Sequence, residues 1–170
     1  MGELGMKKFA IMRHGPAEEE SSSGRDEDRE LTKKGRERVK AVAEALVNAD
    51  EAPGVIVTSP LARALQTAEI VAKAAKVPVE INSGLKPDCL PRKVLEASKF
   101  GARGEMIVGH EPSLSALVDG LLEQCKVGWP GRFSMEKAMV VGFGQKEGKL
   151  RLRYVLEPKG LIWIFDKRKS

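Results

Sequence analysis

The 170-residue chain is poor in several residue types, and each shortage argues against a class of protein. Its two cysteines are too few for a disulfide framework, and cysteine and histidine show no zinc-binding spacing. Aromatic residues make up only 5%, which disfavours a base-stacking surface for nucleic acid. No apolar run approaches the roughly 20 residues of a membrane span, and the first residues lack the apolar segment of a signal peptide. The default expectation is a cytoplasmic protein without a metal site.

The formal charge of +5 at pH 7 allows two interpretations. A basic surface can bind nucleic acid, but here the basic residues are scattered, and their densest cluster is the tail Lys167-Arg168-Lys169. A basic pocket for an anionic substrate explains the same charge with fewer assumptions. We therefore expect neither nucleic acid nor a membrane among the partners.

Short apolar runs alternate with stretches of helical periodicity. Strands are expected over residues 8–12, 55–58, 77–81, 104–109, 138–143, 150–156 and 161–165, and helices over 33–48, 61–75 and 113–123, with a short helix near residues 94–95. This alternation predicts an α/β fold with a mainly parallel sheet. Gly144 and Gly148 separate two late strands, which predicts a hairpin and an antiparallel edge. No repeat or internal boundary is visible, so residues 1–170 are expected to form a single domain.

Charged and imidazole side chains follow three of the expected strands. Arg13, His14 and Gly15 follow the first strand, and His110 follows the fourth. Arg63 stands in the first turn of the helix that follows the second strand. Open α/β sheets bind their ligands at the carboxyl ends of parallel strands. We therefore expect two imidazoles and two guanidiniums to lie together at one edge of the sheet.

Four blocks of residues in a fixed order carry a resemblance to a known family. They are Arg13-His14-Gly15, Arg29-Glu30-Leu31-Thr32 with Gly35, Ser59-Pro60 with Arg63-Ala64 and Gln66-Thr67, and Gly109-His110-Glu111-Pro112. Over about residues 7–118 the chain resembles the histidine phosphatase superfamily, and in length and spacing its compact SixA-type phosphohistidine phosphatases. The resemblance implies a phosphoglycerate-mutase-like three-layer sandwich and a phosphatase that needs no cofactor.

The chemistry of the shared residues agrees with this resemblance. Guanidinium groups bind phosphoryl oxygens well, so Arg13 and Arg63 are expected to hold the substrate and stabilise the transition state. A histidine nucleophile must be neutral, and the two arginines should lower the pKa of His14. One of its ring nitrogens would be held by a backbone carbonyl, which we expect to be that of Gly15. His110 is expected to donate to a phosphoryl oxygen.

Further residues near these blocks are expected to complete the site. Ser59 opens a helix whose free backbone N–H groups could face an anion, and we expect Ser59 and Gly15 to contact the substrate. Arg29 is expected either to support the pocket or to form a surface ion pair. The polar segment 16–30 is expected to be a mobile loop beside the site, although a plain linker is the alternative.

The group that protonates the leaving group is not evident from the sequence. Asp88 and Glu111 are the available candidates, and neither stands in a recognisable acid position. A departing imidazole is protonated more easily than an alkoxide. The missing acid therefore favours phosphohistidine over ordinary phosphate esters.

The sequence thus predicts a metal-independent phosphatase that forms a phosphohistidine intermediate and removes phosphate from phosphohistidine on proteins. One alternative is a small-molecule phosphomonoesterase with the same pocket. Another is a phosphate- or phosphoprotein-binding module without turnover. The expected partners are a phosphorylated protein or a small phosphorylated substrate, with phosphate or vanadate as further ligands of the pocket.

Overall fold

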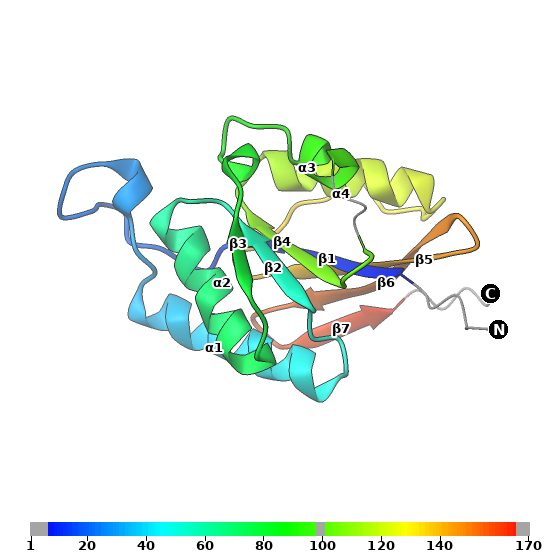
Figure 1. The fold of residues 1–170 in the computed structure, drawn as a ribbon, viewed down its shortest axis with the longest axis horizontal. Helices are drawn as coiled ribbons and strands as arrows, with labels where there is room; N and C mark the ends of the chain where they lie inside the picture. Colours follow the sequence, from blue (N-terminus) through cyan, green and yellow to red (C-terminus); the bar gives the residue numbers. More distant parts are fainter. Residues whose placement is uncertain (1–6, 98–100, 166–170) are drawn as a thin grey trace.

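A seven-stranded sheet lies between two layers of helices in the computed structural model, which describes residues 7–97 and 101–165 (Figure 1). The strands are β1 (Lys7–Arg13), β2 (Val55–Thr58), β3 (Val79–Ile81), β4 (Glu105–Gly109), β5 (Val140–Lys146), β6 (Lys149–Glu157) and β7 (Ile162–Phe165). The helices are α1 (Lys33–Asn48), α2 (Ala62–Ala75), α3 (Pro91–Ala97) and α4 (Ser113–Gln124), with short 3₁₀ helices η1 (Asp26–Asp28) and η2 (Ser83–Leu85).

The sheet is parallel on one side of β1 and antiparallel on the other. Its order is β3-β2-β4-β1-β5-β6-β7, and β1 pairs in parallel with β4 and antiparallel with β5. The strands β5, β6 and β7 continue as an antiparallel meander. The predicted three-layer α/β sandwich with a parallel core and an antiparallel edge is confirmed.

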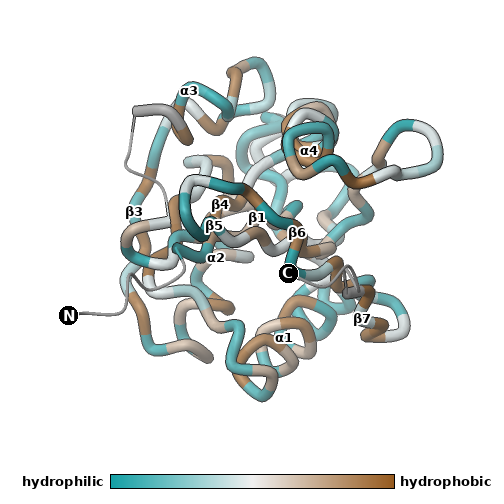
Figure 2. The backbone as a smooth tube through the Cα atoms, turned by 90° about the vertical axis from the view of Figure 1, so that its right-hand side faces the viewer, coloured by the Kyte–Doolittle hydropathy of each residue, from teal (hydrophilic) through white to brown (hydrophobic). Residues whose placement is uncertain are grey.

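Each face of the sheet has its own apolar core, because side chains alternate along a strand. On β1, Ala10 and Met12 point into the core beneath α1 and α2, and Ile11 points into the core beneath α4. In Figure 2, α4 and α1 lie on opposite sides of the strands. Helix α1 buries Val39, Val42, Ala43 and Leu46, which recur at the predicted helical spacing. Burying each large aliphatic side chain contributes about 1.5–3 kcal/mol, so these two cores anchor β1 from both faces.

The expected strand boundaries shift where the backbone makes other contacts. β3 begins at Val79 rather than Val77, because Pro78 has no N–H to donate and only its carbonyl accepts, from Ile56 N at 3.0 Å. β5 begins at Val140 rather than Ala138. The N–H of Ala138 instead faces the carbonyls of Arg13 and His14, and its φ is 70°.

The segment 16–30 is a closed loop rather than a plain linker. Its two arms meet where Glu18 N donates to Glu30 O at 2.8 Å and where Ala17 and Leu31 form an isolated bridge. The 3₁₀ helix η1 lies between the arms. The expected mobility of this loop stays a prediction.

Every helix within the described ranges is too short or too polar to cross a membrane. The basic cluster at residues 167–169 lies outside the described residues.

Gly35 offers a test of how the 16–30 loop packs on α1. A Cβ at this position would lie 2.0 Å from the carbonyl oxygen of Pro16. Helix propensity alone predicts that alanine would stabilise the helix by about 1 kcal/mol. The backbone contact reverses that sign, so Gly35→Ala should lower the free energy of unfolding by roughly 2 kcal/mol.

Urea denaturation of the wild type and the variant measures this difference. The matched control is Gly128→Ala, because a Cβ there meets no atom within 4 Å. It should change stability by less than about 0.5 kcal/mol. A Gly35→Ala variant as stable as the wild type would contradict the packing described.

Candidate active site

Strands β1 and β4 place two imidazoles side by side at the carboxyl edge of the parallel strands. The backbone of β1 is fixed there from both sides, since Arg13 N donates to Met139 O at 3.2 Å and His14 N donates to Gly109 O at 3.1 Å. The ring centroids of His14 and His110 are 5.1 Å apart. Both rings are buried, with 7% and 2% of the residue surface exposed.

The ring of His14 has a fixed tautomer. Its Nδ1 lies 2.7 Å from the carbonyl oxygen of Gly15. A carbonyl only accepts, so Nδ1 carries the proton and Nε2 keeps its lone pair. Gly15 is held in turn, because its N–H donates to Thr67 Oγ1 at 3.0 Å, and that hydroxyl donates to Arg63 O at 2.7 Å. A Cβ on Gly15 would lie 2.5 Å from Val39 Cγ2, so no larger residue fits without rearrangement.

Burial lowers the pKa of His14 from its usual 6.5 to about 3. The hydrogen bond to Gly15 opposes the shift, while His110, Arg63 and Arg13 add to it. The predicted direction is therefore confirmed, although removal from water contributes more than the arginine charges. His14 is neutral across the physiological range of pH.

His110 is oriented by Ser59. Its Nε2 lies 2.8 Å from Ser59 Oγ, and its Nδ1 is buried without a hydrogen-bond partner among the described residues. Burial lowers the pKa of His110 to about 4, with a further decrease from Arg63 and an opposing contribution from Asp26. A buried polar atom without a partner is typical of a site that receives a ligand or water.

Arg13 directs its guanidinium into the same edge. Its NH1 donates to Met135 O at 2.8 Å, and its Nε is buried without a partner among the described residues. The Nε of Arg13 and the Nδ1 of His110 are thus two buried nitrogens without a hydrogen-bond partner among the described residues.

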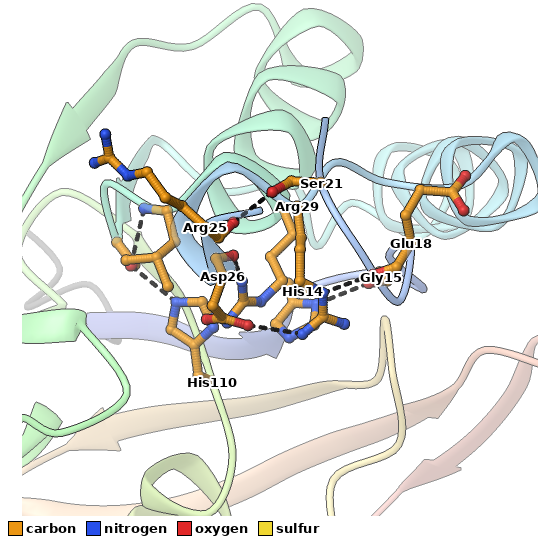
Figure 3. Close-up of polar contacts among 11 residues, drawn as sticks. His14, Gly15, Glu18, Ser21, Arg25, Asp26, Arg29 and His110 are labelled. Carbon is orange, nitrogen blue, oxygen red and sulfur yellow. Dashed lines mark hydrogen bonds and ion pairs between the residues drawn. The ribbon is translucent and has the colours of Figure 1, made fainter. Parts of the chain in front are cut away.

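Arg63 is buried, with 6% of its surface exposed, and its guanidinium is occupied by Asp26 from the 16–30 loop. Figure 3 shows Asp26 with Arg29 and the imidazoles of His14 and His110. NH1 donates to the backbone oxygen of Asp26 at 2.8 Å, and NH2 donates to Oδ2 at 3.0 Å. The other carboxylate oxygen accepts from Arg29 NH1 at 2.8 Å. The hydrogen bond from Arg29, followed by that from Arg63, lowers the pKa of Asp26 against the opposing effect of burial.

The remaining candidates contact the site indirectly. Arg29 forms the expected ion pair with Asp26, and its Nε donates to Glu18 O at 2.6 Å. Ser59 and Gly15 hold the two imidazoles by hydrogen bonds, so the structure gives both a positioning contact.

The two candidate acids differ in their surroundings. Both carboxylate oxygens of Glu111 accept hydrogen bonds from Ser115, one from its N–H and one from its hydroxyl, at the start of α4. Asp88 lines a hollow of about 500 Å³, which Lys86 and Asp26 also line.

Asp26 is the residue that sequence reasoning missed. It lies in the charged run Asp26-Glu27-Asp28, which reads as an exposed surface, and 62% of its side chain is exposed. Its position three residues before Arg29 was the available signal, because that spacing lets the two side chains pair across one turn of η1.

Comparisons with known proteins assign the chain to a family. Residues 9–87 match the model of the histidine phosphatase superfamily (branch 1). An uncharacterized protein from Picosynechococcus sp. is 33% identical over 149 residues, which cover 84% of this chain and 87% of that protein. The chain belongs to branch 1 of the histidine phosphatase superfamily.

Solved structures share the fold of this histidine phosphatase. The protein histidine phosphatase SixA complexed with tungstate superposes with a TM-score of 0.75 at 22% identity, covering 91% of this chain and 99% of that one. The mycobacterial glucosyl-3-phosphoglycerate phosphatase complexed with VO3 gives a TM-score of 0.61 at 19% identity, covering 86% and 96%. Both structures hold an oxyanion. Within residues 7–97 and 101–165, no group of three or more His, Cys, Asp or Glu side chains is placed to hold a metal ion.

The lowered pKa values of His14 and His110 predict how the stability of this phosphatase depends on pH. Both imidazoles bind protons near pH 6.5 in the unfolded chain but only near pH 3 and 4 in the folded protein. Between pH 6.5 and about 4 the unfolded chain therefore holds more protons, so acid favours unfolding. The free energy of unfolding should fall by up to about 1.4 kcal/mol per pH unit for each histidine.

Urea denaturation at pH 7.0, 5.5 and 4.5 measures this slope. The His14→Gln variant lacks one of the two titrating groups, and its stability should fall less steeply over the same interval. Carboxylates contribute equally to both proteins. Equal slopes would show that His14 does not titrate with the lowered pKa.

Proposed function

We propose that this protein is a metal-independent phosphatase that transfers a phosphoryl group to His14 and then to water, and that its preferred substrate is phosphohistidine on a protein. The observation that carries the proposal is the hydrogen bond from His14 Nδ1 to the carbonyl of Gly15. It leaves the lone pair on Nε2, in an imidazole that stays neutral at physiological pH.

Cationic and hydrogen-bonding groups around His14 support phosphoryl binding. Arg13 offers its unpartnered Nε, and His110 offers its unpartnered Nδ1. Arg63 offers a second guanidinium once a ligand displaces Asp26. Guanidiniums in a buried site stabilise the charge that spreads over the equatorial oxygens in the transition state.

The hydrogen bonds of Ser59 are compatible with a His110 imidazole that carries its proton on Nδ1. The Ser59 hydroxyl oxygen accepts from Leu61 N at 3.3 Å, so its own proton is free to be donated to His110 Nε2. In that arrangement Nδ1 carries the imidazole proton, and the N–H group donates a hydrogen bond to a phosphoryl oxygen. Ser59 thereby orients this donor.

The reaction then follows in two steps. The lone pair of His14 Nε2 attacks phosphorus, the bond from phosphorus to the leaving group breaks, and the leaving group takes up a proton. Water next attacks the phosphorus of the phosphohistidine, and the P–N bond breaks. One proton of the water replaces the proton taken by the leaving group, the other stays on orthophosphate, and the neutral imidazole is restored. Each step moves the phosphoryl group in line between its two partners.

Asp26 is the carboxylate best placed to protonate a leaving group. Its carboxylate accepts a hydrogen bond from Arg63, whereas both carboxylate oxygens of Glu111 accept hydrogen bonds from Ser115. When a phosphoryl group takes its place on Arg63, Asp26 loses a cationic partner and gains an anionic neighbour. Both changes raise the pKa of a carboxyl and favour its protonated form.

Two arguments support a preference for phosphohistidine: the chemistry of the leaving group and the similarity to known phosphatases. An imidazole departs with less help from an acid than an alkoxide, and Asp26 is largely exposed. SixA is a protein histidine phosphatase, and its structure superposes with the higher TM-score of the two compared. The alternative, a small phosphate ester, draws on the mycobacterial glucosyl-3-phosphoglycerate phosphatase, which shares the fold.

The first test of the mechanism is the covalent intermediate. Rapid quenching with a ³²P-labelled substrate should trap an acid-labile, base-stable phosphoenzyme, because phosphohistidine has these stabilities. His14→Ala should form none and should lose at least 10³-fold in kcat, since the nucleophile is absent. Gly128→Ala is the control and should behave as the wild type. Turnover by His14→Ala at the wild-type rate would contradict the mechanism.

The second test compares substrates. The kcat/KM for a phosphohistidine peptide should exceed that for a phosphoserine peptide of the same sequence by at least tenfold, about 1.4 kcal/mol in transition-state binding. Asp26→Asn should widen this ratio, because the ester depends more on an acid. A tenfold preference for phosphoserine or for sugar phosphates would favour the small-ester alternative.

A further inference from the structure

The carboxylate of Asp26 occupies the guanidinium of Arg63, where the phosphoryl group of a substrate is expected to bind. Two of its N–H groups donate to the backbone oxygen and the Oδ2 of Asp26, at 2.8 and 3.0 Å. Guanidinium binds phosphoryl oxygens through the same paired donors. A phosphoryl group that uses Arg63 must therefore displace Asp26.

Several contacts hold Asp26 in this position. Arg29 donates to its Oδ1 at 2.8 Å and is itself anchored on Glu18 O at 2.6 Å. The neighbouring turn is closed where Asp28 N donates to Arg25 O at 3.2 Å and Ser23 Oγ donates to Asp28 Oδ2 at 2.6 Å. A tethered group of this kind competes at a high effective concentration.

The charge of the loop acts in the same direction. Residues 16–30 hold seven carboxylates and two guanidiniums, a net charge of −5, while the remaining residues carry +10. A negative loop at the entrance disfavours free anions at long range. This diffuse repulsion is screened by salt, whereas the contact of Asp26 with the buried Arg63 is screened much less.

We propose that Asp26 is a specificity-determining residue, an internal competitor for Arg63 that keeps inorganic phosphate from occupying the pocket. The inference rests on the phosphoryl-binding half of the proposed function. Orthophosphate must displace Asp26 and makes no favourable contact with the freed carboxylate. A phosphorylated substrate displaces the same carboxylate but brings a leaving group that the freed Asp26 can contact. The competitor therefore weakens the binding of product more than that of substrate, and it speeds product release.

Binding of orthophosphate and orthovanadate to the full chain tests this inference without turnover. Isothermal titration calorimetry at pH 7 and 0.15 M salt should give at least tenfold tighter binding by Asp26→Asn than by the wild type. Asp26→Ala should behave likewise, and it removes any residual hydrogen bond from the asparagine. Circular dichroism of each variant verifies the fold.

Glu20→Gln is the matched control, because it removes one negative charge from the same loop at an exposed residue six positions before Asp26. Its affinity for orthophosphate should stay within twofold of the wild type. Equal gains in Asp26→Asn and Glu20→Gln would show that only diffuse charge acts, and would overturn the inference.

Arg63→Ala separates the inference from the proposed function. It should weaken orthophosphate binding by at least tenfold, and adding Asp26→Asn to it should change nothing further, because the competition needs Arg63. If Arg63→Ala weakens orthophosphate binding while Asp26→Asn leaves it unchanged, Asp26 does not compete for Arg63, and the proposed phosphoryl pocket is still supported. If Arg63→Ala has no effect, the phosphoryl pocket and the inference both fail.

Discussion

The chemistry of this protein depends on keeping two imidazoles out of water. Burial is the largest contribution to the lowered pKa values of His14 and His110. The surrounding contacts follow from that constraint. A buried ring must satisfy its nitrogens, and the carbonyl of Gly15 and the hydroxyl of Ser59 each take one of them. In the proposed function, the other nitrogen of each ring serves the phosphoryl group.

The arginines differ in how they are held, and this difference divides their roles. Arg13 is fixed by the backbone carbonyl of Met135, and the carboxylates of Glu111 and Glu136 act on its charge only through space. Arg63 is paired with Asp26, a charged partner on a surface loop. In the proposed function, the first guanidinium is a permanent part of the anion site, and the second enters it when a ligand displaces Asp26. The histidine phosphatase fold supplies both from strand and helix ends at one edge of the sheet.

Sequence periodicity and strand ends were sufficient to predict most of the framework. The apolar runs and the helical spacing predicted the strands and helices, because each element buries one face or both. The meeting of Arg13, His14 and His110 followed from the rule that parallel strands end at one edge. Asp26 was beyond this reasoning, since its position depends on a loop that no periodicity describes. The dominant effect of burial on the pKa of His14 was also missed, because sequence neighbours reveal nearby charges but not the exclusion of water.

The central position of β1 has a consequence for how the chain reaches its native state. Ala10 pairs with Met106, 96 positions later, and Ile11 pairs with Val141, 130 positions later. Contacts of such separation require the closure of long loops, which slows folding. During synthesis from the N-terminus, Ile11 and Met12 emerge long before the strands that cover them. His14, which we propose as the nucleophile, is therefore synthesised well before the residues that fix its backbone, because Gly109 and Met139 lie about 100 positions further along the chain.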